Sequence, residues 1–196
     1  MTKYILFSEP QEQVLAKIAP ELFLKSNMKI AYMPSDGANP SNPKYESFWK
    51  SYIENHNSEI VPINNSVRDS AVQNESEKII NSDALILTGG NTFQFLNHLK
   101  KSGLDKIIVE YSQTDKIIVG FSAGAIILSS TIEIAQLPPC DENLIGLTDL
   151  SALNLIEFDI YPHYDEIEHK NIVDEYEKKT GRSVKRLTNE DLLIIN

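Results

Sequence analysis

Residues 116–128 read Lys116-Ile117-Ile118-Val119-Gly120-Phe121-Ser122-Ala123-Gly124-Ala125-Ile126-Ile127-Leu128, in which a β-branched run passes through Gly-x-Ser-x-Gly into a segment able to form a helix. In this motif the serine occupies a strained strand-to-helix turn. The flanking positions are glycines because bulky residues there would collide with the strand and the helix. The turn presents the Ser122 hydroxyl at the carboxyl edge of a sheet. The N–H of Ala123, at the start of the helix, is then placed to help bind an oxyanion. A tight turn with a capping serine, or a phosphate-binding loop, is the plainer interpretation.

Short apolar runs alternate with longer amphipathic stretches on both sides of this turn. We expect strands at 4–7, 29–33, 59–63, 84–87, 116–119, 158–161, 184–187 and 192–195. We expect helices at 11–25, 45–55, 67–81, 93–101, 123–130 and 166–179. Because these strands are apolar on both faces, the alternation predicts an α/β fold, in which a mostly parallel sheet is flanked by helices. No linker or repeat divides residues 1–196, so we expect one domain.

Composition narrows the classes of partner and cofactor. The chain has 196 residues, 28 acidic against 18 basic ones, and a formal net charge of −10. Such a charge repels phosphate backbones and anionic lipid, which argues against nucleic acid and membrane surfaces as partners. Cys140 is the only cysteine, which excludes an intrachain disulfide and a thiolate-rich metal site. We expect no metal and no organic cofactor.

The distribution of apolar residues bears on location. No apolar run approaches the roughly 18 residues typical of a membrane-spanning helix. The apolar part of the N-terminal segment, residues 4–7, is too short for the core of a signal peptide and fits a first strand better. These features predict a soluble, cytoplasmic globular protein.

A second strand that ends in glycine supports the same site. The stretch reads Asp83-Ala84-Leu85-Ile86-Leu87-Thr88-Gly89-Gly90-Asn91-Thr92-Phe93, with Asn91 or Thr92 able to cap the following helix. The glycine pair leaves its N–H groups unobstructed for an anion or a carbonyl oxygen. On a strand near Ser122, this turn would supply a second oxyanion donor.

A serine nucleophile needs a base, and the chain has four histidines. His56 and His98 lie in polar helical stretches typical of the surface. His163 follows the strand at 158–161, at a carboxyl end like that of Ser122, and is the preferred base. His169 is the reserve candidate. Spacing does not choose the acid that would hold the imidazole; the candidates are Glu133, Asp141, Asp159, Asp165, Glu190 and Asp191.

Two irregular segments are expected near the site. Residues 35–43 form a turn-rich loop after the second strand, where it would be either a wall of the site or a plain solvent loop. Residues 132–155 include Pro138-Pro139, which would keep a connection extended beside the site.

At Gly89-Gly90-Asn91-Thr92-Phe93, Gly120-Phe121-Ser122-Ala123-Gly124-Ala125 and Pro162-His163-Tyr164, the sequence resembles the peptidase E (α-aspartyl dipeptidase) and cyanophycinase family of serine peptidases. The resemblance covers most of the chain and implies a three-layer fold like that of class I glutamine amidotransferases. It also implies that Ser122 is the nucleophile, that His163 is the base, and that the N–H groups of Gly90 and Ala123 form the oxyanion hole. The same resemblance makes a homodimer plausible.

The sequence departs from this family at two places. In the peptidase E branch an aspartate stands just before a Met-Pro pair, whereas the matching stretch here is Ala135-Gln136-Leu137-Pro138, with Leu137 at the position of the acid. In the cyanophycinase branch the acid of the triad is a glutamate near the C-terminal strand. The resemblance therefore implies that Glu190 is the triad acid here. Peptidase E also has an arginine that reads the substrate aspartate, and the run Asn171-Ile172-Val173-Asp174-Glu175-Tyr176 contains none. Lys170 would replace it only with poorer geometry.

These observations predict a serine peptidase that hydrolyses small peptides, dipeptidase-like, with a relaxed or altered preference for an N-terminal aspartate. Two alternatives stay open. One is a flavodoxin-like module that binds a nucleotide or phosphate at its glycine turns. The other is an amidotransferase-like or inactive relative, although such amidotransferases use a cysteine and Cys140 does not lie at a glycine elbow.

Overall fold

The computed structural model describes residues 1–37 and 43–196. Its central element is a six-stranded sheet in the order β3-β2-β4-β5-β1-β8. The strands are β1 (Lys3–Phe7), β2 (Lys29–Met33), β3 (Glu59–Pro62), β4 (Ala84–Leu87), β5 (Ile117–Phe121) and β8 (Leu192–Ile195). All neighbouring pairs are parallel except β1 and β8. Every residue of β4 and β5 is buried, as expected where helices cover both faces of a sheet.

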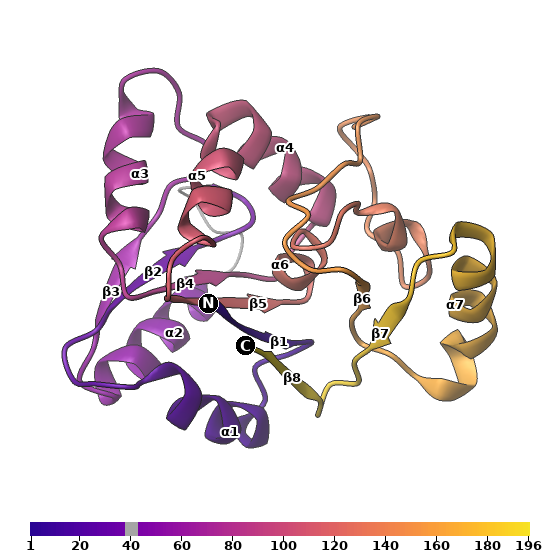
Figure 1. The fold of residues 1–196 in the computed structure, drawn as a ribbon, viewed down its shortest axis with the longest axis horizontal. Helices are drawn as coiled ribbons and strands as arrows, with labels where there is room; N and C mark the ends of the chain where they lie inside the picture. The colour runs from indigo at the N-terminus through magenta and orange to yellow at the C-terminus, as the bar shows by residue number, and fades with distance from the viewer. Residues whose placement is uncertain (38–42) are drawn as a thin grey trace.

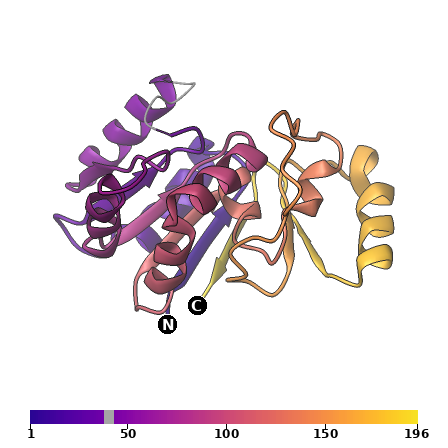
Figure 2. The ribbon, with the colours of Figure 1, turned by 90° about the horizontal axis from the view of Figure 1, so that it is seen from above.

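Helices cover the two faces of this sheet, which makes three layers (Figures 1 and 2). One face carries α1 (Glu12–Leu22) and α2 (Pro43–Asn55), and the other carries α3 (Ala71–Ile80), α4 (Thr92–Ser102), α5 (Leu104–Tyr111) and the short α6 (Ala123–Ile126). The strand residues alternate between two apolar clusters. Ile5 and Phe7 pack with α1 and α2, whereas Leu6 packs on the opposite side. The period of two along the strands therefore separates two cores.

A second, two-stranded sheet stands beside the first. The parallel strands β6 (Asp159–Tyr161) and β7 (Val184–Arg186) are joined by α7 (Glu166–Thr180) and lie at the right of Figure 1. The eight expected strands are all present, but these two form their own sheet. Lys185 is exposed and Arg186 half-buried, so β7 lacks the two apolar faces that a central strand requires.

The helices differ from the expectation in three places. The sequence pattern missed α5 and the short 3₁₀ helix η1 (Glu133–Gln136). Gly103, with φ 78°, ends α4 and turns the chain into α5. α6 ends at residue 126 rather than 130, since the backbone carbonyls of Ile127 and Ser130 accept hydrogen bonds from Leu153 and Ala152. Tertiary pairing here overrides local helix propensity.

Part of the turn-rich loop expected at 35–43 falls outside the described residues, namely 38–42. Among the residues that the structure describes, none of the helices is both long and apolar enough to span a bilayer.

Candidate active site

The segments that follow β1, β2, β4 and β5 meet at one edge of the sheet and surround a cavity of about 320 Å³. Ligands of open α/β sheets bind at this carboxyl edge. The residues that line the cavity are Ser8, Glu9, Tyr32, Pro34, Ser35, Asp36, Tyr45, Thr88, Gly89, Gly90, Phe121, Ser122 and His163. Two residues of the turn-rich loop expected at 35–43, Ser35 and Asp36, are thus part of its wall.

Ser122 occupies a sharp turn between β5 and α6. Its backbone has φ 49° and ψ −118°, a conformation that residues with a side chain rarely adopt. The flanking glycines are required by close packing of the backbone. A Cβ at Gly124 would lie 2.0 Å from the Leu87 carbonyl oxygen, and one at Gly120 would lie 2.6 Å from the Gly124 oxygen. The strand-to-helix elbow expected from the motif is present.

His163 meets Ser122 from the second sheet. It follows β6, has φ 55°, and places Nε2 at 3.0 Å from Ser122 Oγ. Its other ring nitrogen, Nδ1, lies 2.7 Å from Asn189 Oδ1. An amide oxygen only accepts hydrogen bonds, so Nδ1 carries the ring proton and Nε2 is free to accept the Ser122 hydroxyl proton. The geometry is that of a nucleophile, a base and a residue that orients the base.

Asn189, rather than the expected Glu190, contacts the imidazole. Glu190 is exposed, and its backbone N–H donates to Thr188 Oγ1 at 3.3 Å. The turn between β7 and β8 is closed by Asp191, whose carboxylate accepts from the Thr188 N–H at 2.8 Å. This turn directs Asn189 toward His163 and leaves Glu190 at the surface, so the contact with the imidazole expected of Glu190 is made by its neighbour Asn189.

The other acidic candidates have partners elsewhere. Asp141 Oδ2 accepts from Thr92 N and Oγ1 at 2.9 and 2.5 Å. Asp165 caps α7 by accepting from the N–H groups of Ile167 and Glu168. Asp159 and Glu133 both accept from Arg182. Each of these carboxylates is explained by local structure. The reserve base His169 is buried in α7, where its Nδ1 accepts from the Asp165 N–H at 2.9 Å.

Ser8 connects the two sheets at the site. It follows β1, is 1% exposed, and donates its hydroxyl proton to the Leu187 carbonyl at 2.9 Å. The same oxygen accepts from the backbone N–H of His163 at 3.0 Å. Ser8 thereby fixes the segment after β7 and the segment after β6, which hold Asn189 and His163. The sequence reasoning missed it, although a polar residue directly after an apolar strand at this edge is a usable signal.

The second glycine turn lies against Ser122. Gly90 has φ 133°, and a Cβ there would lie 1.9 Å from Ser35 Oγ, so only glycine fits. A Cβ on Gly89 would lie 3.2 Å from Ser122 Cβ. Ala123 opens α6, and the N–H groups of a first helical turn lack an intrahelical acceptor. The Gly89-Gly90 turn therefore packs against the Ser122 turn, and the start of α6 follows Ser122 directly.

The described walls of the larger cavity combine aromatic and polar side chains, with two carboxylates among them. Glu9 and Asp36 contribute carboxylates, and none of the described lining residues is a lysine or an arginine. Burial, with the nearby charge of Glu46 and Asp36, raises the pKa of Tyr32 well above its ordinary value, and burial does the same for Tyr45. Both phenols are therefore neutral hydrogen-bonding groups at physiological pH.

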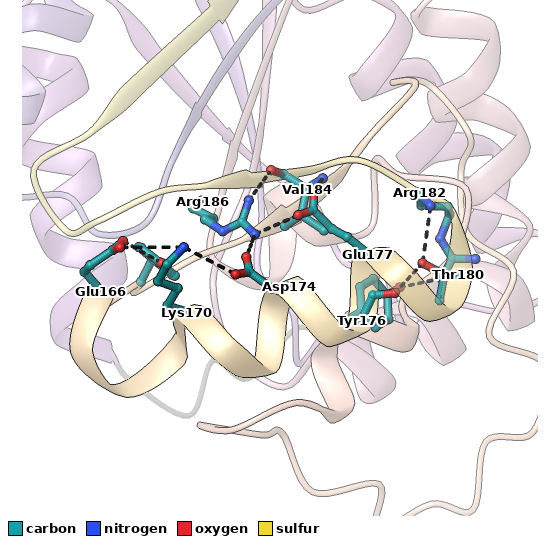
Figure 3. A network of polar contacts seen from close by, with 10 residues as sticks. Glu166, Lys170, Asp174, Tyr176, Glu177, Thr180, Arg182, Val184 and Arg186 are labelled. Carbon is teal, nitrogen blue, oxygen red and sulfur yellow. Dashed lines mark hydrogen bonds and ion pairs between the residues drawn. The ribbon is translucent and has the colours of Figure 1, made fainter.

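The chain has three arginines, and none of them lines this cavity in the part of the chain that the structure describes. Arg182 and Arg186 lie in a network of polar contacts around α7 (Figure 3). Arg186 Nη2 is 2.7 Å from both Asp174 and Glu177. Burial lowers the pKa of Arg182, but its hydrogen bonds with Glu133, Tyr176 and Asp159 outweigh this effect and raise it above the ordinary value. The network attaches α7 to the two strands that lead to His163 and Asn189.

The described residues contain no candidate metal site built from a cluster of histidine, cysteine, aspartate or glutamate side chains. Across residues 1–37 and 43–196, no group of three or more histidine, cysteine, aspartate or glutamate side chains is arranged to hold a metal ion. Cys140 is exposed and does not line the cavity beside Ser122.

Comparison of the sequence with known proteins finds one family and several relatives, all described as peptidases. The model of the family described as Peptidase family S51 matches residues 6–196. The uncharacterized peptidase Lmo0363 of Listeria monocytogenes is 40% identical over 95 residues, which cover 48% of this chain and 46% of that protein. Peptidase E of Shewanella denitrificans is 29% identical over 140 residues, covering 71% of this chain and 55% of the relative. The chain spans about half the length of the curated relatives it matches.

Two solved structures share the fold. A candidate peptidase E protein from Listeria monocytogenes EGD-e superposes with a TM-score of 0.80 at 24% identity, covering 100% of this chain and 98% of that chain. A peptidase from an acI-B1 actinobacterium gives a TM-score of 0.69 at 16% identity, covering 100% and 84%. The predicted α/β fold, a mostly parallel sheet between helices, is confirmed.

Proposed function

Because this chain belongs to peptidase family S51, we propose that it is a serine-type peptidase that hydrolyses small peptides with Ser122 as the nucleophile. The observation that carries the proposal is the 3.0 Å separation of Ser122 Oγ and His163 Nε2 at the carboxyl edge of the sheet. A phosphate-binding turn would not need an imidazole at this distance, whereas acyl transfer does.

In the proposed reaction, Ser122 Oγ attacks the carbonyl carbon of the scissile peptide bond while His163 Nε2 takes the hydroxyl proton. The N–H groups of Gly90 and Ala123 hold the oxygen of the tetrahedral intermediate. His163 then donates the proton to the leaving amine, and water hydrolyses the acyl-enzyme by the same steps in reverse. No step requires a metal or an organic cofactor.

Asn189 takes the place of the acid in this proposal. Its Oδ1 accepts the Nδ1 proton of His163 at 2.7 Å and so selects the tautomer in which Nε2 is a base. An amide does not stabilise the charged imidazolium as a carboxylate would, but it holds the ring orientation, as asparagine does in Cys–His–Asn peptidases. The triad we propose is therefore Ser122, His163 and Asn189.

The charge of the larger cavity bears on the substrate. Recognition of an N-terminal aspartate calls for a cation, and arginine provides it best through two parallel hydrogen bonds. The described lining residues contain Glu9 and Asp36 instead. We therefore expect a small peptide whose residue in this cavity is not an aspartate, which is an altered specificity relative to an α-aspartyl dipeptidase.

The proposal is tested by labelling the purified full chain with a fluorophosphonate and by hydrolysis of a panel of dipeptides and chromogenic amides. The wild type should be labelled and active, whereas Ser122→Ala and His163→Ala should lose both properties. Ser130→Ala, which changes an exposed serine in the segment after α6, is the matched control and should behave as the wild type. Equal hydrolysis by the wild type and Ser122→Ala would exclude the serine mechanism. Absence of labelling, together with thermal stabilisation by a nucleotide, would favour the flavodoxin-like alternative.

A further inference from the structure

A second, smaller cavity lies beside the Ser122–His163 pair. Its volume is about 160 Å³, and it shares only these two described residues with the larger cavity. The short helix α6, the 3₁₀ helix η1 with the segment after it, and the end of β6 form its walls. Its other lining residues are Ile126, Ile134, Ala135, Leu137, Pro139, Asp141, Tyr161 and Pro162. The two cavities thus offer two places for substrate groups around one nucleophile.

The wall formed by residues 134–139 is apolar and firmly held. Ile134 is 2% and Ala135 6% exposed, which fixes the floor of the cavity. The Leu137 N–H donates to the Ile134 carbonyl at 3.1 Å, and the Asp141 N–H donates to the Ala135 carbonyl at 3.1 Å. Leu137 also stands where the resemblance to peptidase E predicts a carboxylate, so an apolar side chain occupies this wall instead.

The one carboxylate at this cavity is already engaged. Asp141 Oδ2 accepts both the N–H and the hydroxyl of Thr92, at 2.9 and 2.5 Å, at the start of α4. This contact attaches the wall to the helix that follows the Gly89-Gly90 turn. Among the described lining residues there is no lysine or arginine that would attract an anionic group.

We propose that this cavity is a specificity subsite for an apolar side chain of the substrate residue next to the scissile bond, with Leu137 setting its size. The inference rests on the proposed function, since it takes Ser122 to be the nucleophile. A cavity of about 150 Å³ admits a benzene ring, so this one accommodates a side chain as large as that of leucine or phenylalanine. Burial of such a side chain should raise kcat/KM about 10-fold to 100-fold over alanine.

The test uses two series of peptide substrates and variants of Leu137. In one series the acyl residue varies among alanine, leucine, phenylalanine, lysine and aspartate with a constant leaving group, and in the other the leaving residue varies in the same way. The wild type should prefer leucine or phenylalanine in one series, which identifies the side of the scissile bond that the cavity serves. Leu137→Phe should lower kcat/KM for the phenylalanine substrate about 10-fold or more and leave the alanine substrate within about twofold. Leu137→Ala should shift the preference toward the larger side chain.

Leu144 provides the matched control. It is 75% exposed in the same connection and lines neither cavity, so Leu144→Phe and Leu144→Ala should keep the wild-type preference. Thermal denaturation of all four variants identifies any loss of folding.

Boronic acids give a second measurement that needs no turnover. Ser122 Oγ adds to boron and its proton passes to His163, so protection of Ser122 from fluorophosphonate measures binding. 2-Phenylethylboronic acid should protect the wild type better than methylboronic acid does, and Leu137→Phe should remove the difference. The subsite is refuted if the Leu137 variants change all probes equally or not at all, or if charged residues are preferred in both series. Failure of the fluorophosphonate to label Ser122 would instead refute the proposed function itself, and the subsite with it.

Discussion

Replacement of Arg182 by methionine should destabilise the part of the molecule that holds the imidazole. Arg182 Nε lies 2.8 Å from Asp159 Oδ2, and the Asp159 side chain, at the first position of β6, is 1% exposed. Asp159 Oδ1 is buried and has no hydrogen-bond partner among the described residues. Without the guanidinium, the buried carboxylate keeps the Tyr176 hydroxyl, at 2.7 Å, as its donor but has lost the positive charge 2.8 Å away.

The magnitude follows from this burial. Removing one partner of a buried ion pair costs about 3–5 kcal/mol of unfolding free energy. We expect the lower end, about 3 kcal/mol, because the Arg182 side chain is 29% exposed and the Tyr176 hydrogen bond is retained. For a protein of this length, each kcal/mol lowers Tm by about 2–4 °C, so the expected fall in Tm is about 6–12 °C.

The assay is thermal and urea denaturation of Arg182→Met beside two reference variants. Arg68→Met removes an exposed guanidinium that donates to the backbone carbonyls of Ser66 and Val67, and it should change Tm little. The double variant Asp159→Asn/Arg182→Met should be more stable than Arg182→Met, because a neutral amide needs no counter-charge. A fall in Tm for Arg182→Met no larger than that for Arg68→Met would refute the reasoning.

Three further predictions concern the site. Gly90→Ala should lower kcat/KM about 100-fold to 1,000-fold, because the Cβ collides with Ser35 Oγ and displaces the proposed oxyanion donor. Gly89→Ala, with its closest contact at 3.2 Å, should lose much less, and equal losses would contradict the argument. Asn189→Ala should lower kcat about 100-fold with little change in KM. Asn189→Asp should stay active and move the acidic limb of the profile of kcat/KM against pH to higher pH, because a carboxylate favours the charged imidazole. An unmoved limb would count against the contact between residue 189 and His163. Ser8→Ala should reduce kcat about 10-fold at nearly constant KM, because the backbone of His163 loses the hydroxyl that holds it, and a change confined to KM would show that Ser8 acts on substrate instead.

Much of the main sheet could be predicted because its strands are short, β-branched and apolar on both faces. The expected strands 84–87 and 116–119 overlap β4 and β5, which lie side by side and hold the two glycine turns. The separation of β6 and β7 into a second sheet could not be predicted. Lys185 and Arg186 deny β7 the two apolar faces of a central strand, but they do not indicate that its partner is β6.

Within the site, Ser122 and His163 could be proposed from the sequence because each lies just beyond the carboxyl end of a strand; the structure brings their side chains together although β5 and β6 belong to different sheets. Asn189 was missed by one position. The turn at Thr188–Asp191 contains four consecutive polar side chains; the Thr188 N–H donates to Asp191 across it, and Asn189 is the one that contacts the imidazole. A sequence records the presence of these side chains but not the hydrogen bond that selects among them.

The division of the site between two sheets has a consequence for its chemistry. Ser122 and the proposed oxyanion donors follow strands of the six-stranded sheet, whereas His163 and Asn189 follow the two strands of the small sheet. The 3.0 Å approach of imidazole to hydroxyl is therefore set by how the sheets dock, and not by either sheet alone. Ser8 adds a further polar contact between them at this edge, because its hydroxyl binds the Leu187 carbonyl and the His163 N–H together. A small shift of the second sheet would lengthen the nucleophile–base contact while each sheet stayed folded, so activity should be lost before cooperative unfolding when this docking is weakened.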